Sequence, residues 1–439
     1  MPCIFEYGII GMGPAGIGMA MSLGSFGKSS NTVCFERGSH INSTDCYLPT
    51  DINCTCTKTC NIISGIGGAS TLSNGKLSNY PAGSGLLDFF DSEQQLRELL
   101  DNTIHDMEKY ISINRVEIDT TTISAAESYF KEKGIIYKYY DVYEFNGNDY
   151  KEYVQNIVQK LKQEGLSLYE NAEITSISRD PIANCFCVKA KTMTGEECYY
   201  IHNLILATGA LDIENNISTA ILEDISHSFE IGVRIEAPSN AFGNILLSHG
   251  DLKLKAHNGR TYCVTQHGSV ISYRTGGLHF LEGSCDPTMF TDYSNLAVLI
   301  KTDELKQVAD FINIFHKKYN GIPIKQRYVD YICQKVSPGK IECSLTGALC
   351  GNINDLLPHS INTCIRQFID DVIIDAMGVS SNAITILAPE LKIVNRLELD
   401  SDFKYNTNLY IIGAATGRFR GILQAMCSGI RCGQLITRR

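Results

Sequence analysis

The sequence lacks both a long apolar run and an early cluster of basic residues. No stretch reaches the roughly 18 apolar residues that a membrane-spanning helix needs, so no transmembrane segment is expected. No lysine or arginine precedes Lys28. Because a secretory signal peptide starts with a positively charged region, the apolar start of the chain is not expected to be one.

Basic residues are also fewer than acidic residues. The 439 residues include 38 Lys and Arg against 48 Asp and Glu, a formal net charge of −10. An acidic surface repels a phosphate backbone, so nucleic acid is not an expected partner, although a local basic pocket for a small anion remains open. The sequence contains neither Gly-x-Ser-x-Gly nor His-Glu-x-x-His, so hydrolase chemistry has no support.

Cysteine, by contrast, is abundant. There are 17 cysteines, an odd number at mostly irregular spacing. Without an export signal, this usage predicts reduced thiols in a cytoplasmic protein. Apolar residues make up 44% of the chain, which is enough for a large core, and the length predicts two domains.

A glycine-rich turn near the start carries the first functional signal. The apolar run 5–10 is typical of a buried parallel strand, GMGPAG follows at 11–16, and 17–23 reads as helix. In such a unit the first glycine permits the tight turn, the second lets a pyrophosphate approach the backbone, and the third lets the helix pack on the strand. The helix N-terminus then faces the phosphates. The residues predicted to bind a dinucleotide here are Gly11, Gly13, Pro14, Ala15 and Gly16.

An acidic residue completes this motif. A second strand, 32–35, ends at Glu36, whose carboxylate is placed to accept hydrogen bonds from ribose hydroxyls. The strand, turn, helix and acid together form the context that a dinucleotide-binding fingerprint requires. This motif alone does not separate NAD from FAD.

The far end of the chain favours FAD. LILATGA at 204–210 is a strand running into a turn of small residues, which adds Thr208 and Gly209 to the predicted cofactor site. LYIIGAA at 409–415 is another strand and turn, and 421–432 reads as helix. An N-terminal dinucleotide fold completed by a C-terminal strand, turn and helix is the layout of flavoproteins with two dinucleotide-binding folds. There the helix N-terminus points at the flavin ring, where negative charge develops on reduction.

We therefore expect an α/β fold: a Rossmann-like FAD-binding domain on a parallel sheet, with an inserted α+β substrate domain. The FAD-binding domain is assigned to 1–91, 146–215 and 385–439, a helical excursion to 92–145, and the substrate domain to 216–384. Only one nucleotide fingerprint is present, so no dedicated NAD(P)H domain is expected.

Several stretches resemble one family. They are GIIGMGPAG at 8–16, GIGGASTLSNGKLS at 65–78, IGVRIEAP at 231–238, SNLAVLI at 294–300 and IIGAATGRFRGILQAMCSGIRCG at 411–433. Together they resemble a largely uncharacterised family of FAD-dependent dehydrogenases and oxidoreductases within the glutathione-reductase-like flavoproteins. The resemblance covers most of the chain and implies the fold and the cofactor.

The same resemblance extends the predicted cofactor site. It matches further residues to the family's AMP-binding positions, to a second glycine-rich segment that runs past the flavin, and to a terminal flavin segment: Glu36, Arg37, Gly67, Gly68, Ser70, Lys76, Gly413, Gly421 and Ile422. The chain departs from the family pattern at GAATGRFRG, where Arg418 and Arg420 bring charge into a turn that is usually small, and at 263–268.

A cysteine-rich loop leaves three interpretations open. Residues 46–60 read CYLPTDINCTCTKTC, with thiols at Cys46, Cys54, Cys56 and Cys60. Four thiolates can bind zinc or an iron–sulfur cluster, although this spacing is irregular for either. Cys56 and Cys60 can instead form a redox disulfide that exchanges electrons with flavin. Reduced, partly buried thiols that pack like small hydrophobes are our leading interpretation.

Candidate catalytic residues lie in QHGSVISYRTGGLH at 266–279. A flavin carries the redox step, while the protein supplies orientation, electrostatics and a proton donor or acceptor. We predict catalytic roles for His267, Tyr273 and Arg274 in this stretch, with Arg274 able to grip a substrate carboxylate as a bidentate fork.

The predicted function is an FAD-dependent oxidoreductase, a dehydrogenase or oxidase, that transfers a hydride between a small organic substrate and flavin N5. NAD(P)H or an electron carrier is a further expected partner, whereas a membrane is not. One alternative is an NAD(P)H-dependent flavin reductase that uses a Cys56/Cys60 redox pair. Another is a non-catalytic FAD- or metal-binding sensor.

Overall fold

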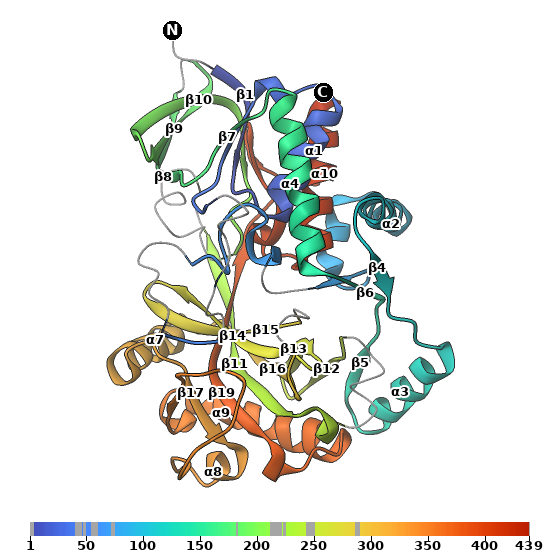
Figure 1. Ribbon diagram of the computed structural model, residues 1–439, viewed down its shortest axis with the longest axis vertical. Coiled ribbons are helices and arrows are strands. Elements are labelled where there is room, and N and C mark those ends of the chain that lie inside the picture. Colours follow the sequence, from blue (N-terminus) through green and yellow to red (C-terminus); the bar gives the residue numbers. More distant parts are fainter. Residues whose placement is uncertain are drawn as a thin grey trace.

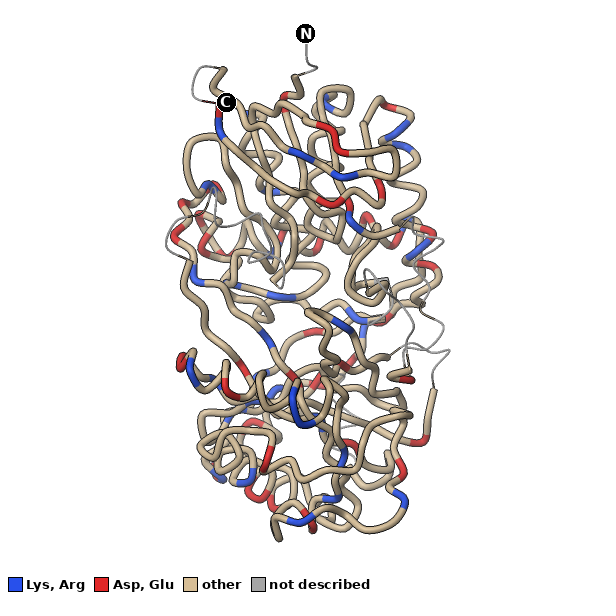
Figure 2. Tube along the Cα trace, turned by 90° about the vertical axis from the view of Figure 1, so that its left-hand side faces the viewer, with Lys and Arg blue, Asp and Glu red and all other residues tan. Residues whose placement is uncertain are grey.

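The chain builds two large sheets that lie one above the other in Figure 1. This computed structural model describes residues 4–39, 46, 50–53, 60–71, 75–180, 183–210, 222, 225–242, 251–285 and 290–438. In the view of Figure 2, acidic and basic residues are interspersed over both halves of the molecule. Within the described ranges, no helix is both long enough and apolar enough to cross a bilayer.

The first sheet has a parallel centre. Its path is β20 (Lys404–Asn406), β21 (Leu409–Ile411), β10 (Gly195–Leu206), β1 (Ile4–Ile10), β2 (Thr32–Phe35) and β7 (Ser167–Tyr169). All neighbours from β21 to β7 pair in parallel, and β20 pairs antiparallel at one edge. The central strands are covered on both faces, which is why they read as apolar runs rather than as alternating patterns. The predicted Rossmann-like α/β fold is confirmed.

Helices cover one face of this sheet and a strand pair extends from it. The helices are α1 (Pro14–Ser25), α4 (Gly147–Gln163) and α10 (Ile422–Thr437), which stand side by side in the upper half of Figure 1. Their apolar residues form one core with the sheet. The strands β8 (Glu173–Asp180) and β9 (Cys185–Thr192) continue antiparallel from β10 and help to bury the opposite face.

The second sheet is almost entirely antiparallel. Its order is β18 (Leu349–Cys350), β17 (Ile324–Arg327), β19 (Thr385–Arg396), β11 (Ser226–Pro238), β16 (Tyr293–Thr302), β13 (Gly259–Thr265), β12 (Lys253–Ala256) and β5 (Ile136–Lys138). It packs with α7 (Leu305–Tyr319), α8 (Tyr328–Ile332), α9 (His359–Phe368) and the π-helix η8 (Ile369–Ala376) around the largest apolar core. Helices pack on an antiparallel sheet here, which is the arrangement of an α+β fold.

Smaller elements connect the two parts. A hairpin of β14 (Ser269–Thr275) and β15 (Leu278–Ser284) lies against the second sheet, and a three-stranded sheet joins β3 (Lys76–Ser78), β6 (Val142–Phe145) and β4 (Ile113–Arg115). The helices α2 (Glu93–Glu108) and α3 (Thr120–Glu132) begin with side-chain caps, from Ser92 and Asp119 respectively.

Two predicted domain limits differ from the observed pairing. The segment 385–439 was assigned to the FAD-binding domain, but β19 at its start pairs with β11 and β17 of the second sheet. The helical excursion 92–145 contains strands as well as helices, and β5 within it pairs with β12 of the second sheet. Antiparallel partners far along the chain leave no local signal, so only the folded structure reveals these pairings.

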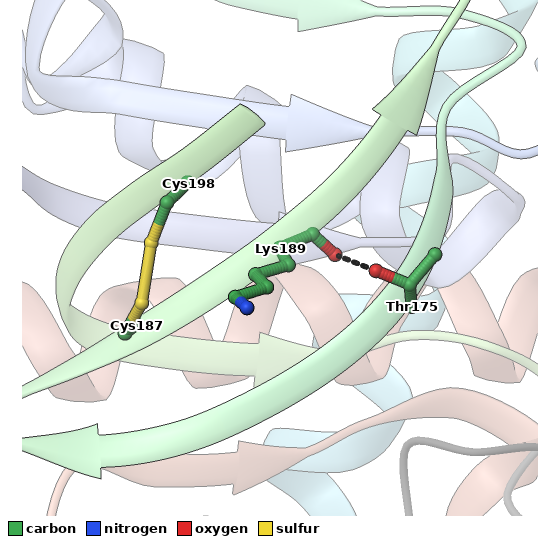
Figure 3. Close-up of a disulfide and its surroundings, with 4 residues drawn as sticks. All are labelled: Thr175, Cys187, Lys189 and Cys198. Carbon is green, nitrogen blue, oxygen red and sulfur yellow. Dashed lines mark hydrogen bonds between the residues drawn. A yellow bond between two sulfur atoms is a disulfide. The ribbon is translucent and has the colours of Figure 1, made fainter. Parts of the chain in front are cut away.

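A disulfide joins Cys187 of β9 to Cys198 of β10 (Figure 3). The two Cα atoms are 6.4 Å apart, within the range that a disulfide spans. The register places Cys198 opposite Lys189, two residues from Cys187, and the Lys189 carbonyl accepts a hydrogen bond from Thr175 at 3.4 Å. The sequence predicts reduced thiols, whereas pairing between these adjacent strands brings the two sulfurs of this pair together.

Glycines bring α1 and α10 into close contact. A Cβ atom on Gly18 would lie 2.1 Å from the Met426 carbonyl oxygen, and one on Gly429 would lie 2.1 Å from the Ala15 carbonyl oxygen. A Cβ atom on Gly433 would lie 2.6 Å from the Ser22 Cβ atom, so the contacts of Gly429 with Ala15 and of Gly433 with Ser22 advance together along both helices, and the helices run parallel. Each follows a parallel strand, β1 or β21, and their N-termini therefore open at the same edge of the sheet.

We expect Gly429→Ala to lower the free energy of unfolding by about 1–3 kcal/mol, because the added methyl group forces the two backbones apart. Gly147→Ala is the control, since nothing lies within 4 Å of a Cβ atom there. It should change stability by less than about 0.5 kcal/mol. Urea unfolding of both variants measures the difference, and equal stabilities would contradict the close helix contact.

Candidate functional site

A cavity of about 590 Å³ lies at the carboxyl edge of the first sheet. Its lining includes residues that directly follow β1, β2 and β10, namely Gly11, Glu36 and Ala207. Ligands of open α/β sheets bind in this place, outside the carboxyl ends of the strands. The predicted cofactor residues that line the cavity are Gly11, Gly13, Pro14, Ala15, Glu36, Arg37, Gly68, Ser70, Thr208, Gly209, Gly421 and Ile422.

The three glycines of the first turn differ in what they do. Gly11 has φ +97°, and a Cβ atom there would lie 2.5 Å from the Ala207 carbonyl oxygen. A Cβ atom on Gly16 would lie 2.0 Å from the Gly11 carbonyl oxygen. Gly13 has an ordinary φ of −71°, and the nearest atom to a Cβ there is the Gly68 Cα at 4.0 Å. Backbone conformation and packing therefore explain Gly11 and Gly16, but neither requires glycine at Gly13.

Two helix N-termini open into this cavity. Gly13 occupies the N-cap position of α1 and Gly421 that of α10, and because glycine has no side chain, neither helix start has a side-chain cap hydrogen bond. Pro14, Ala15, Ile422 and Ala425 of the two helices line the cavity. Free backbone N–H groups and the helix dipole make such ends favourable to negative charge.

Glu36 joins three backbone segments through its buried carboxylate. One oxygen accepts from the Met12 N–H at 2.9 Å, and the other accepts from the N–H groups of Gly38 at 2.8 Å and Gly65 at 2.9 Å. A carboxylate has about four acceptor positions, so one remains for a ribose hydroxyl. The sequence motif predicted Glu36 as a ligand for ribose. It did not indicate that Glu36 also connects the first turn to the second glycine-rich segment through hydrogen bonds.

The second glycine-rich segment runs across the first turn. The Gly67 N–H donates to the Met12 carbonyl oxygen at 2.8 Å, and Gly67 and Gly68 both have positive φ angles, +91° and +58°. The Ser70 hydroxyl donates to the Gly67 carbonyl at 2.5 Å and to the Tyr150 hydroxyl at 3.2 Å. Gly68 and Ser70 line the cavity, whereas Gly67 does not and instead bonds the segment to the first turn through Met12.

Some of the remaining predicted cofactor residues lie outside the lining. Gly16 packs against the Gly11 carbonyl, and the Gly413 N–H donates to the Ser428 hydroxyl at 2.9 Å. The Lys76 ammonium donates to the Val264 carbonyl of β13, so it bridges the two parts of the fold. Burial lowers the pKa of Lys76, but the neighbouring Cys285 and Asp251 raise it, and the net shift is upward.

None of the predicted catalytic residues lines the cavity. The His267 ring stacks on Phe290 with ring centroids 5.0 Å apart, and its buried Nδ1 has no hydrogen-bond partner in the described part of the chain. Tyr273 is 4% exposed, and its hydroxyl donates to the Leu391 carbonyl at 3.3 Å. The Arg274 N–H contacts the Cys60 sulfur at 3.4 Å. Tyr273 and Arg274 lie on β14, where Tyr273 contacts β19 of the second sheet, and His267 precedes this strand.

Two other residues of the second part face the cavity. They are Tyr262 on β13 and Glu282 on β15. Glu282 accepts hydrogen bonds from the Lys392 ammonium at 2.5 Å, from Arg234 at 3.3 Å and from the Gly283 N–H at 3.3 Å. The sequence analysis missed both residues, because only the folded sheet brings β13 and β15 to the carboxyl edge of the first sheet.

A buried ion cluster supports this side of the cavity. Arg234 is fully buried and donates to Glu390 at 2.9 Å and to the Asn295 side chain at 2.6 Å. Burial raises the pKa of Glu282, but the charges of Lys392 and Arg234 outweigh it and hold this pKa below its usual value. The cluster therefore pairs Arg234 and Lys392 with the carboxyl groups of Glu282 and Glu390.

The cysteine-rich loop is only partly described. Cys54 and Cys56 lie outside the described residues. Cys46 and Cys60 pack against the core of the second sheet rather than lining the cavity. Among the residues with a described placement, no three His, Cys, Asp or Glu side chains are grouped as metal ligands.

Comparison with known proteins gives only distant structural similarity. No protein-family model and no curated protein matches the chain. A flavoprotein/dehydrogenase from Cytophaga hutchinsonii is 10% identical with a TM-score of 0.40, covering 99% of this chain and 78% of that chain. Glycine oxidase from Geobacillus kaustophilus is 11% identical with a TM-score of 0.39, at 99% and 95% coverage. The p-nitrophenol 4-monooxygenase from Pseudomonas putida is 10% identical with a TM-score of 0.35, at 94% and 73%.

Glu36→Gln should lower the free energy of unfolding by about 1–3 kcal/mol, because the new amide group turns a donor toward at least one buried backbone N–H. Glu6→Gln is the control, since Glu6 forms a half-exposed ion pair with Lys28 at 3.3 Å. Its loss should cost less than about 1 kcal/mol. Urea unfolding measures both, and a neutral Glu36→Gln would show that the three backbone contacts contribute nothing.

Arg234→Met should destabilise the protein by about 3–5 kcal/mol, because it leaves the buried Glu390 carboxylate without its main partner. The double variant Arg234→Met/Glu390→Met removes both charges and should lose less than the sum of the single effects, by at least about 1 kcal/mol. Denaturant unfolding of the four proteins in this cycle tests the coupling. Strict additivity would contradict a buried pair.

Proposed function

We propose that the protein is an FAD-dependent oxidoreductase, with the dinucleotide lying along the cavity. Gly13 carries this proposal. Its backbone φ of −71° suits any residue, and a Cβ atom would meet no atom closer than 4.0 Å. Glycine is thus left unexplained by the protein itself, and the space it leaves lies at the uncapped start of α1. A diphosphate that approaches the backbone accounts for both features.

The lining residues suit the other parts of the same cofactor. Glu36 keeps one acceptor position for a ribose hydroxyl, and the buried Thr208 hydroxyl, which lacks a partner in the described part of the chain, offers another polar contact. Ala414, Gly421 and Ile422 line the cavity at the start of α10, where they form an apolar surface against which a flat ring system can pack. The dipole of α10 favours negative charge at that point.

FAD, when bound, supplies reversible two-electron chemistry. The residues of this chain would bind and orient it, exclude water with the apolar side chains of Ile63, Ile422 and Ala425, and stabilise charge through the two helix N-termini. The finer form of the proposal is hydride transfer between a small organic substrate and flavin N5.

The two alternative functions have less support. A reductase that uses Cys56 and Cys60 needs this pair beside the flavin, but Cys60 lies against the second core and contacts the Arg274 N–H. A metal-binding sensor needs three or four grouped ligands, and the described thiols at Cys46 and Cys60 supply two. Neither arrangement explains the open space at Gly13.

Two neighbouring glycines test the proposal. The gently purified wild-type protein should carry FAD, or take it up, at one per chain. Gly13→Ala should weaken FAD binding by at least about tenfold, or ~1.4 kcal/mol, because its methyl group enters the cavity. Its unfolding free energy should change by less than about 0.5 kcal/mol.

Gly16→Ala is the contrasting variant. Its methyl group would meet the Gly11 carbonyl oxygen, so the apoprotein itself should lose about 1–3 kcal/mol of stability. Flavin absorbance after gel filtration and urea unfolding of the apoproteins provide the two readouts. Wild-type FAD affinity in Gly13→Ala, or a wild-type protein that binds no FAD, overturns the proposal.

A further inference from the structure

We propose that Tyr262 and Glu282 form a substrate-binding subsite on the side of the cavity built by the second sheet. Its ligand is an uncharged molecule with an apolar body and one polar end, such as an amide or an alcohol. That end accepts a hydrogen bond from the Tyr262 phenol and donates one to the Glu282 carboxylate. The inference deepens the proposed function and rests on it, because it assumes that FAD occupies the rest of the cavity.

Tyr262 presents an unused hydroxyl to the cavity. Two cations lie over its ring: the Arg260 guanidinium is 4.8 Å from the ring centroid and the Lys392 ammonium 5.2 Å. Arg260 is itself fixed by Glu230 through two hydrogen bonds of 2.7 and 2.6 Å. The phenol has no hydrogen-bond partner in the described part of the chain. A hydroxyl fixed in place in this way is available to a ligand.

Glu282 offers the matching acceptor. Its carboxylate receives three hydrogen bonds, from Lys392, Arg234 and Gly283, so one of about four acceptor positions remains. The Lys392 ammonium lies 2.5 Å from Glu282 and also contacts the face of the Tyr262 ring. This cation therefore fixes both cavity-facing residues at once, which gives the subsite a defined geometry rather than two independent side chains.

The charges around the subsite argue for an uncharged ligand. Arg234 and Lys392 balance Glu282 and Glu390, and each of these four groups has an opposite charge within 3.3 Å. Arg420, a further cation, donates to the Ile393 carbonyl at 2.7 Å and does not line the cavity. An ion that left water beside Glu282 would find the described charges of this cluster already paired, and its desolvation would go uncompensated.

The rest of the lining suits an apolar body. Ile63, Ala414, Ile422 and Ala425 line the same cavity. The subsite therefore pairs one donor and one acceptor with an apolar surface, which is the usual composition of a small-molecule site.

Three probes that share a phenyl ring and differ in charge test the class of ligand. Benzamide is uncharged and carries a donor beside an acceptor, whereas benzoate is an anion and benzylamine a cation. Isothermal titration calorimetry measures their affinities for the protein after incubation with FAD, and needs no flavin signal. Benzamide should bind more tightly than either ion. Tighter binding of benzoate or benzylamine overturns the proposal, as does a failure of all three to bind at millimolar concentration.

Tyr262→Phe removes the hydroxyl and keeps the aromatic ring that contacts Arg260 and Lys392. It should weaken benzamide binding by about two- to tenfold, the worth of one hydrogen bond, and leave FAD affinity unchanged. Tyr319→Phe is the matched control: Lys318 lies 5.4 Å from its ring centroid, its hydroxyl contacts the Asn352 carbonyl, and it does not line the cavity. It should bind benzamide as the wild type does.

The outcomes separate this inference from the proposed function. Equal benzamide affinity in Tyr262→Phe and the wild type overturns the subsite. Lower FAD affinity in Tyr262→Phe also overturns it, because the phenol would then contact the cofactor. A protein that takes up no FAD, yet binds benzamide in a way that depends on the Tyr262 hydroxyl, refutes the proposed function and supports the subsite.

Discussion

The close contact between α1 and α10 is the constraint on which the rest of the site depends. Gly18 and Gly429 let the two backbones approach so closely that a Cβ atom at either position would overlap a carbonyl oxygen. Because both helices follow parallel strands of one sheet, this contact places their uncapped N-termini side by side. The residues at the two chain ends are some four hundred positions apart in sequence, yet they form one wall of a single cavity.

Electrostatics then divides the cavity into two environments. Toward the first sheet, backbone N–H groups of the helix starts and the Glu36 carboxylate offer partners to a charged, hydroxyl-bearing ligand. Toward the second sheet, Arg234, Lys392, Glu282 and Glu390 neutralise one another, and the exposed polar groups are a phenol and one side of a carboxylate. A dinucleotide fits the first environment and an uncharged substrate fits the second, so the two proposals follow from different groups of contacts.

The sequence analysis predicted residues of one cavity where a function needs a short, contiguous pattern. Gly11, the segment 13–15, Glu36 and the turn at 208–209 were predicted as cofactor residues, and all of them line the same cavity. It did not predict the cavity-lining residues that come from strands distant in the sequence. His267, Tyr273 and Arg274 were predicted from one contiguous stretch, but none of them lines the cavity. Tyr262 and Glu282, which lie on neighbouring segments of the chain, line the cavity instead of the three predicted residues.

The sequence by itself determined the parallel first sheet and the nucleotide-binding turn, because apolar runs and glycine spacing are local properties of the chain. The tertiary structure alone decided the partners of β5 and β19, the double role of Glu36 and the identity of the residues across the cavity. These depend on hydrogen bonds and ion pairs between segments remote in sequence. Such contacts acquire their energy only after the intervening chain has folded, so no local pattern records them.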